Sequence, residues 1–213
     1  MIRKFKKLAE RARPILATKE KRRELWPEAR RLSERHIRNC RLIVNRYEML
    51  KEEEIPKGGT YAEIGIWKGH YSAHILENLR PTKLHLVDLS RMAVDTVTEQ
   101  FKKQIDDGLV EVHHSDSAEW LLSMPDEHFD WIYIDGDHSY EGVRRDLAAA
   151  HQKIKPDGVI SLNDYIFVGS TDLAKYGVIE AVNEFCIEND FELIHFALHG
   201  RMYNDVTIRK IRE

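Results

Sequence analysis

From residue 58 onward, the sequence alternates short apolar runs with longer stretches in which apolar and charged residues recur at helical spacing. The short runs predict buried strands, and the longer stretches predict helices. Regular alternation of strand and helix is typical of a parallel sheet with helices on both faces. We place the strands at about 60–65, 83–88, 109–114, 130–135 and 157–163.

The end of the chain departs from this alternation. Residues 191–198 and 202–211 are strand-like runs joined by His199-Gly200-Arg201. This link is too short for a crossover between parallel strands, so the pair predicts an antiparallel hairpin. The predicted fold class is α/β: a Rossmann-like, doubly wound, seven-stranded sheet with a terminal antiparallel hairpin.

The segment before this sheet has a different pattern. Leucine and isoleucine recur at loosely helical spacing with arginines between them, which predicts helix over residues 1–12 and roughly 19–54. The Pro-Lys-Gly-Gly sequence at residues 56–59 then breaks the pattern. We predict two parts: a basic helical extension over residues 1–57, acting as a lid or an oligomer face, and an α/β domain over residues 58–213.

The charge is divided unevenly between these parts. Residues 1–46 have 16 Lys and Arg against 5 Glu, a net of +11, and the remainder has 17 against 31, a net of −14. A basic segment of this kind meets an anionic partner, such as nucleic acid or a lipid surface, or packs against the acidic body of its own or a second subunit. We favour packing, because Phe5 and Trp26 are too few aromatic residues for base stacking.

Bulk composition describes a soluble globular chain. Of its 213 residues, 42% are hydrophobic and 32% are charged, and no apolar run approaches the ~20 residues that span a bilayer. The basic N-terminus is not followed by the apolar region of a signal peptide. Cys40 and Cys186 lie far apart in helix-like contexts and indicate free thiols of a reducing compartment, so we expect a cytoplasmic protein.

The first predicted strand ends in an acidic turn that contains glycine. Glu63 ends the strand, and Gly65 and Gly69 follow at Gly-x-x-x-Gly spacing before a helix begins. Glycines let the backbone turn tightly and approach a ligand closely. The spacing is not the Gly-x-Gly-x-x-Gly of dinucleotide enzymes, and the Glu63 carboxylate would repel a pyrophosphate but attract an ammonium or sulfonium group.

Acids also end the next two strands. Asp88 lies about twenty residues past the glycine turn, where a ribose is held through its hydroxyls, although an Asp there also serves as a helix N-cap. Asp116 and Ser117 suit an adenine amino group, or again a helix cap. His113 and His114 beside them suggest a metal, but the sequence offers no partner at ligand spacing, so we interpret them as a packed or solvated pair.

The fourth predicted strand carries the most informative motif. Its apolar run ends in Asp135-Gly-Asp137-His138, and the fifth strand ends in Asn163-Asp164. Ligands bind outside the carboxyl ends of strands in open α/β sheets, and neighbouring parallel strands lie only ~5 Å apart. Asp135, Asn163 and Asp164 are therefore placed to hold one cation between them.

Taken in order, the glycine turn, the acidic strand ends, the Asp-Ser pair and the Asp-Gly-Asp-His-Ser-Tyr stretch at residues 135–140 resemble a class I S-adenosylmethionine-dependent methyltransferase. Asp146-Leu147 and the Lys-Pro-Asp-Gly turn at residues 155–158 make the chain similar to the small bacterial methyltransferases of the macrocin and sugar O-methyltransferase group. The resemblance covers roughly residues 58–211 and does not extend to the basic segment.

The resemblance implies S-adenosylmethionine as the cofactor and gives each motif a role. It implies cofactor contacts at Glu63, Gly65, Gly69, Asp88, Asp116 and Ser117. For the metal-dependent members of the family, it implies ligands to Mg²⁺ or another divalent cation at Asp135, Asn163 and Asp164. Asn163 would ligate through its carbonyl oxygen, which gives the site one charge fewer than an acidic pair.

The implied reaction is O-methylation of a small hydroxylated acceptor, a saccharide among the candidates. A sulfonium is already a good methyl donor, so the enzyme has to align the acceptor and activate its hydroxyl. A cation would lower the pKa of the hydroxyl while a base takes its proton, with Asp137 the first choice by resemblance and His138 the second. Two other interpretations stay open: an NAD- or nucleotide-dependent oxidoreductase on a similar sheet, and a non-catalytic methyltransferase-like binding module.

Overall fold

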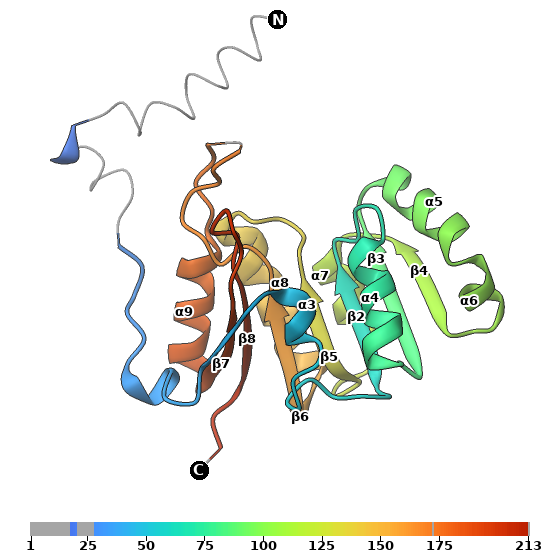
Figure 1. The fold of residues 1–213 in the computed structure, drawn as a ribbon, viewed down its shortest axis with the longest axis horizontal. Helices are drawn as coiled ribbons and strands as arrows, with labels where there is room; N and C mark the ends of the chain where they lie inside the picture. The colour runs from blue at the N-terminus through green and yellow to red at the C-terminus, as the bar shows by residue number, and fades with distance from the viewer. Residues whose placement is uncertain (1–17, 21–27, 172, 213) are drawn as a thin grey trace, which may run out of the picture.

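One mixed sheet forms the centre of the computed structural model, which describes residues 18–20, 28–171 and 173–212 (Figure 1). Within these residues, eight strands lie in the order β1-β7-β8-β6-β5-β2-β3-β4. β8 lies between β6 and β7 and is antiparallel to both, whereas the other neighbours are parallel. The strands are β1 (Arg41–Ile43), β2 (Thr60–Ile64), β3 (Lys83–Asp88), β4 (Val110–His114), β5 (Phe129–Ile134), β6 (Ile154–Leu162), β7 (Phe191–Ala197) and β8 (Asp205–Lys210).

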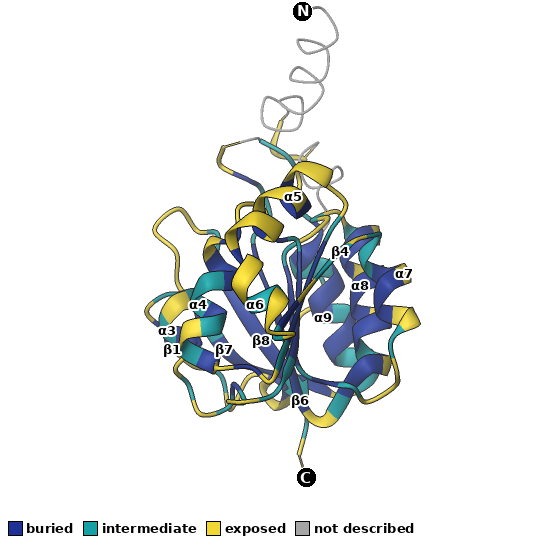
Figure 2. Ribbon diagram, turned by 90° about the vertical axis from the view of Figure 1, so that its right-hand side faces the viewer, coloured by how far each residue is buried: buried dark blue, intermediate teal, exposed yellow. Residues whose placement is uncertain are grey.

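Helices cover both faces of the sheet (Figure 2). They are the 3-10 helix η1 (Glu34–His36) and the α-helices α3 (Arg46–Met49), α4 (His70–Leu79), α5 (Arg91–Gln100), α6 (Lys102–Asp106), α7 (Ser117–Ser123), α8 (Tyr140–Lys153) and α9 (Val178–Asn189). One core is buried between the sheet and α7, α8 and α9, and the other between the sheet and α3, α4 and α5. No helix in the described part of the chain is long and apolar enough to cross a membrane.

The predicted crossover strands and the terminal hairpin are confirmed, each within three residues of its predicted bounds. The predicted count of seven strands is wrong by one, because β1 adds an eighth strand, parallel to β7 at the edge of the sheet. In β1 only Ile43 is buried, and its three residues are too few to give a strand pattern in the sequence. The segment before residue 58 therefore contributes a strand to the sheet.

The predicted helix over roughly 19–54 is wrong for most of residues 28–54. Helix there is confined to η1 and α3, and residues 28–33 run without helix beside α9 (Figure 1). Side chains of the acidic domain hold this path: Arg30 lies 2.8 Å from Glu188, and the Asn183 amide donates a 2.7 Å hydrogen bond to the Arg30 carbonyl. These contacts replace helical ones. The predicted helix over residues 1–12 lies outside the described residues.

The two halves of the parallel sheet diverge between β2 and β5. From β2 the chain continues outward to β3 and β4, and from β5 it continues the other way to β6. Crevices at such a reversal, outside the carboxyl ends of the strands, bind ligands in open α/β sheets. β2 and β5 are in register with Ile64 opposite Ile134. The residues that follow them, Gly65 and Asp135, therefore begin the candidate site.

Ile160 in β6 gives a test of this sheet core. Its side chain is fully buried, and it pairs with Ile132 of β5 on one side and Ile208 of β8 on the other. We expect Ile160→Ala to lower the free energy of unfolding by about 2–5 kcal/mol, through lost burial and a cavity. Leu122→Ala in α7, where the leucine is 51% exposed, should change it by less than about 1 kcal/mol. Urea unfolding measures the stability of both variants, and equal losses in the two would contradict the placement of Ile160 in the core.

Candidate active site

Among the residues that the structure describes, three adjoining cavities lie along the edge of the sheet where the parallel strands end. Going from β4 toward β8, their volumes are about 410, 380 and 350 Å³, and we name them the first, second and third cavity. The first and second share Gly65 and Asp88, and the second and third share Arg46. Asp135 lines all three, so the cavities meet around the end of β5.

The glycine turn brings β2 against the end of β5. Gly65 has φ 83°, and a Cβ at this position would lie 2.0 Å from the carbonyl oxygen of Asp135. Gly69, at φ 71°, precedes α4 and leaves no free space for a Cβ beside Val97. Both positions therefore require glycine, for conformation and for space. The sequence predicts that the backbone of this turn approaches a ligand closely. In the structure the backbone at Gly65 lies against the backbone of Asp135.

Glu63 ends β2 with its carboxylate buried. Its side chain is 1% exposed, and the Ser72 hydroxyl of α4 donates a 2.5 Å hydrogen bond to it. Burial raises the pKa of Glu63 to about 8, in spite of that hydrogen bond. Glu63 also lines the second cavity. A cationic group bound there would compensate the burial of its charge.

Asp88 at the end of β3 braces the glycine turn. One carboxylate oxygen accepts a 2.9 Å hydrogen bond from the Ile66 amide, and the other accepts a 2.7 Å bond from the Ser90 amide. The oxygen that binds Ile66 also accepts from the Trp67 amide at 3.4 Å, so the oxygen that binds Ser90 is the one that can still accept from a ligand. Asp88 lines the first and second cavities, at the position expected for a ribose-binding acid.

Asp116 and Ser117 line the first cavity, and Asp116 also caps α7. The Asp116 carboxylate accepts from the Glu119 amide at 3.1 Å and from the Arg145 guanidinium at 2.6 Å. The backbone hydrogen bond and the neighbouring arginine lower the pKa of Asp116. The Ser117 hydroxyl donates to Asp146 at 2.6 Å. Asp116 therefore caps α7 and lines the first cavity at the same time.

Asp146 is a member of the site to which sequence reasoning gave no role beyond the family resemblance. It is 2% exposed and lines the first cavity, and its Oδ2 has no hydrogen-bond partner among the described residues. Burial raises its pKa to about 6. The available signal was an acid at helical spacing between Val143 and Ala150 on the buried face of α8. A donor in the first cavity would satisfy the free oxygen.

The three residues predicted as metal ligands lie around the imidazole of His138. Its Nε2 is 3.3 Å from Asp135 Oδ1 and 3.5 Å from Asp164 Oδ2. Burial lowers the pKa of His138, but Asp135, Asp164 and Asn163 outweigh it, so the net pKa is raised. The Asn163 amide also donates to Asp205 at 3.2 Å. The predicted cluster is therefore brought together, with a side chain of the protein at its centre.

Arg46 joins the site from the segment before the sheet domain. Its Nη1 lies 3.7 Å from Asp135 Oδ2 and donates to the Tyr133 hydroxyl at 3.2 Å. That hydroxyl in turn donates to Asp205 at 2.6 Å, and burial raises the pKa of Asp205 to about 7. Arg46 lines the second and third cavities. Sequence reasoning missed it because it assigned this segment to a separate helical extension.

Asp137 lies apart from this cluster. Its carboxylate accepts 2.9 Å hydrogen bonds from the amide and the hydroxyl of Ser139, and it packs against Gly142 at the start of α8. It lines the first cavity, whereas His138 lines the second. The two predicted bases are neighbours in sequence but face different parts of the site.

Comparisons with known proteins give a domain type for part of the chain and related structures for its fold. Residues 62–165 match a family model described as a methyltransferase domain, and no curated protein matches the sequence. A solved protein from Corynebacterium glutamicum has 14% identity and a TM-score of 0.61 over 96% of this chain and 91% of that chain. An S-adenosylmethionine-dependent methyltransferase from Aquifex aeolicus has 15% identity and a TM-score of 0.55, covering 76% of this chain and 96% of its own.

A third solved structure was determined with a cofactor product bound. It is TrmK of M. capricolum in complex with S-adenosylhomocysteine, at 12% identity and a TM-score of 0.56, covering 78% of this chain and 67% of that chain. At such identities these structures share a fold with this chain. The family match adds the domain type for residues 62–165, which contain the glycine turn and the acidic strand ends.

Replacing Asp146 should reveal its cost to stability. Its folded pKa of about 6 lies above the ~3.9 of an unfolded chain, so folding at neutral pH buries a charge that was solvated. Stability therefore falls as pH rises from about 4 to 6. We expect Asp146→Asn, which still accepts from Ser117, to gain about 1–3 kcal/mol at pH 7.5 and to lose this gain near pH 4.

Urea unfolding across pH measures the effect of Asp146→Asn. Asp157→Asn is the matched control, because the Asp157 side chain is 92% exposed and should give no such gain. An Asp146→Asn variant that is less stable than the wild type at pH 7.5 would contradict the burial argument.

Proposed function

We propose that the chain is an S-adenosylmethionine-dependent methyltransferase of class I and that it methylates a hydroxyl group of a small acceptor. The match of residues 62–165 to a methyltransferase-domain model and the shared fold support this proposal. In this proposal the cofactor spans the first and second cavities, and the acceptor occupies the third. The main support for this arrangement is that Asp135 lines all three cavities, so a cofactor and an acceptor would meet beside its carboxylate. The finer assignments below follow from the chemistry of each cavity.

The first cavity suits the adenosine end of the cofactor. Asp88 supplies an acceptor oxygen for the ribose hydroxyls, and Asp116 and Asp146 supply acceptors for an amino group. The unpartnered Oδ2 of Asp146 favours a hydrogen-bond donor such as the adenine amino group at that point. The Asp116 carboxylate already accepts from Arg145, so it would accept from the amino group through a remaining lone pair.

The second cavity suits the methionine end. Glu63 and Arg46 line it with a carboxyl group and a guanidinium, which match the ammonium and the carboxylate of an amino acid. An ammonium group near Glu63 would return the pKa of the buried carboxyl toward its usual range. The acid also disfavours a pyrophosphate, so a dinucleotide cofactor fits this turn less well than S-adenosylmethionine does.

The third cavity suits a small polar acceptor. Its lining is rich in hydrogen-bonding groups: Asn45, Tyr47, Asn163, Asp164, His199 and Tyr203. Its volume of about 350 Å³ is in the range of small-molecule sites. A saccharide offers several hydroxyls to such a lining and apolar C–H faces to its aromatic rings, which makes it the acceptor class we favour. Three aspartates, Asp135, Asp164 and Asp205, disfavour an anionic one.

Residues of this chain have two tasks in the transfer. They hold the acceptor hydroxyl in line with the methyl group, and they remove the hydroxyl proton as the new O–C bond forms and the S–C bond breaks. We assign the base to His138, because its Nε2 faces the cluster at the border of the second and third cavities. Asp137 is held by Ser139 in the first cavity, at the adenosine end.

A divalent cation would bind to the same cluster. Two carboxylates and one amide oxygen, from Asp135, Asp164 and Asn163, are ligands that Mg²⁺ accepts, and both carboxylates already approach one point. When bound, the cation would lower the pKa of the acceptor hydroxyl. Arg46 already balances part of this negative charge without a cation, and we propose that metal assistance depends on the acceptor.

Calorimetric titration of S-adenosylhomocysteine tests the cofactor assignment, with Mg²⁺ and again with EDTA. We expect micromolar or tighter binding to the wild type and at least a tenfold loss in Gly65→Ala, whose Cβ would meet the Asp135 carbonyl. Gly108→Ala is the matched control, because Gly108 also has positive φ but has nothing within 4 Å of a Cβ. Should Gly65→Ala fail to fold, Asp88→Asn tests the same site. Binding of NAD in preference to S-adenosylhomocysteine would refute the assignment.

Replacing the two candidate bases tests the catalytic assignment once an acceptor is found by screening hydroxylated compounds with radiolabelled S-adenosylmethionine. We expect His138→Gln to lower kcat by about 10²–10⁴ with little change in cofactor affinity. Asp137→Asn should lower kcat by less than about tenfold. A larger loss in Asp137→Asn than in His138→Gln would return the base to Asp137.

A further inference from the structure

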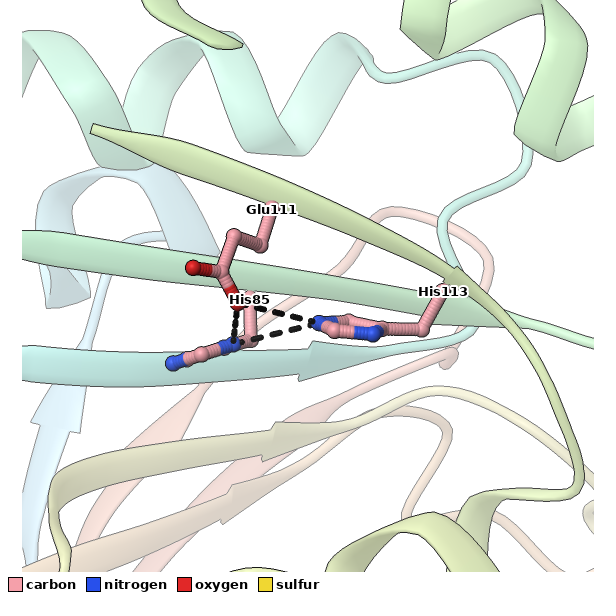
Figure 3. Close-up of side chains that lie close together, drawn as sticks. All are labelled: His85, Glu111 and His113. Carbon is pink, nitrogen blue, oxygen red and sulfur yellow. Dashed lines mark hydrogen bonds and ion pairs between the residues drawn. The ribbon is translucent and has the colours of Figure 1, made fainter. Parts of the chain in front are cut away.

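A second cluster of ligand-type side chains lies outside the three cavities, on strands β3 and β4. His85 projects from β3, and Glu111 and His113 project from β4, with all three side chains meeting at one point (Figure 3). His85 is opposite Glu111 in the strand register, and His113 is two residues further along β4, on the same face as Glu111. We propose that these residues form a binding site for a divalent transition metal, with Zn²⁺ as the best match.

The distances between the three donor atoms fit a tetrahedral ion. His85 Nδ1 lies 3.2 Å from His113 Nε2 and 3.5 Å from Glu111 Oε2, and the remaining side of the triangle is 3.8 Å. Ligands on a tetrahedral Zn²⁺ with bonds of about 2.0–2.1 Å lie roughly 3.3 Å apart. An ion above this triangle would therefore reach all three atoms after shifts of a few tenths of an ångström.

The ligand types agree with the same group of metals. Two imidazole nitrogens and one carboxylate oxygen are a common set for Zn²⁺, and they favour it over Mg²⁺ or Ca²⁺, which prefer oxygen alone. The Glu111 side chain is 47% exposed, so a fourth position facing solvent can hold a water molecule. Three protein ligands and one water complete a tetrahedral site.

Neighbouring side chains hold the three ligands in place. Lys83 Nζ lies 2.6 Å from Glu111 Oε1, which leaves Oε2 toward the histidines. The Trp120 ring packs on both imidazoles, with centroid distances of 5.4 Å to His85 and 4.9 Å to His113. These contacts bring the three donor atoms together before any ion arrives, which lowers the cost of ordering them on binding.

A second group of the same kind is less suited. Glu52, Glu54 and His195 also converge among the described residues, but Arg41 lies 2.7 Å from Glu52 and 3.7 Å from Glu54. A guanidinium already balances both acids there. The competing account of the β3–β4 cluster is a hydrogen bond between its two histidines, and the two accounts differ in whether the protein binds an added metal.

The site lies apart from the proposed methyl-transfer chemistry, and its test does not rest on that function. Tag-free full-length protein is stripped with EDTA, dialysed and titrated with Zn²⁺ by calorimetry, and Co²⁺ is added separately to record the visible absorption of tetrahedral cobalt. We expect one equivalent of micromolar or tighter binding and a tetrahedral Co²⁺ spectrum. His113→Ala and Glu111→Gln should each weaken this binding at least tenfold.

The control variant is His114→Ala, which removes the adjacent histidine on β4, whose Nε2 instead lies 3.0 Å from the Leu89 carbonyl. Its Zn²⁺ affinity should equal that of the wild type. Glu111 is half-exposed, so Glu111→Gln keeps the test valid if His113→Ala does not fold. Absence of Zn²⁺ binding in the wild type, or equal binding in the wild type and Glu111→Gln, would overturn the proposal.

Discussion

The contact between the glycine turn and the end of β5 is the constraint on which the candidate site depends. Gly65 adopts φ 83° and has no room for a Cβ beside the Asp135 carbonyl, so β2 and β5 end close together. Since Gly65 and Asp135 both line the first and second cavities, one ligand can touch both strand ends. A side chain at position 65 would push these ends apart, and the acids that they carry would no longer converge.

Charge compensation allows many acids to share this edge of the sheet: Glu63, Asp135, Asp164 and Asp205. Arg46 and His138 lie among them and lower the repulsion. Burial also raises the pKa of Glu63 to about 8 and that of Asp205 to about 7, so part of the negative charge is removed near neutral pH. An environment that already needs positive charge is well suited to a cofactor that carries a sulfonium and an ammonium group.

Strand ends could be predicted from the sequence because each apolar run leads directly into its polar residues, and the parallel topology then brings these residues to one edge. Glu63, Asp88, Asp116 and Asp135 were predicted in this way, and all four line the first or second cavity. Arg46 and Asp205 could not be found, because they reach the site through the β1–α3 segment and the antiparallel strand β8, whose positions follow from long-range packing. The approach of His113 to His85 could not be predicted either, because the register between β3 and β4 depends on tertiary packing.

A crystal structure with S-adenosylhomocysteine would test the central claim most directly, namely that the cofactor lies across the ends of β2 and β5. We expect the adenine beside Asp116 and Asp146 in the first cavity and the amino acid end between Glu63 and Arg46 in the second. The sulfur should then face Asp135 and the third cavity. A ligand bound in the reverse direction, or away from the Gly65 turn, would contradict this placement of the cofactor.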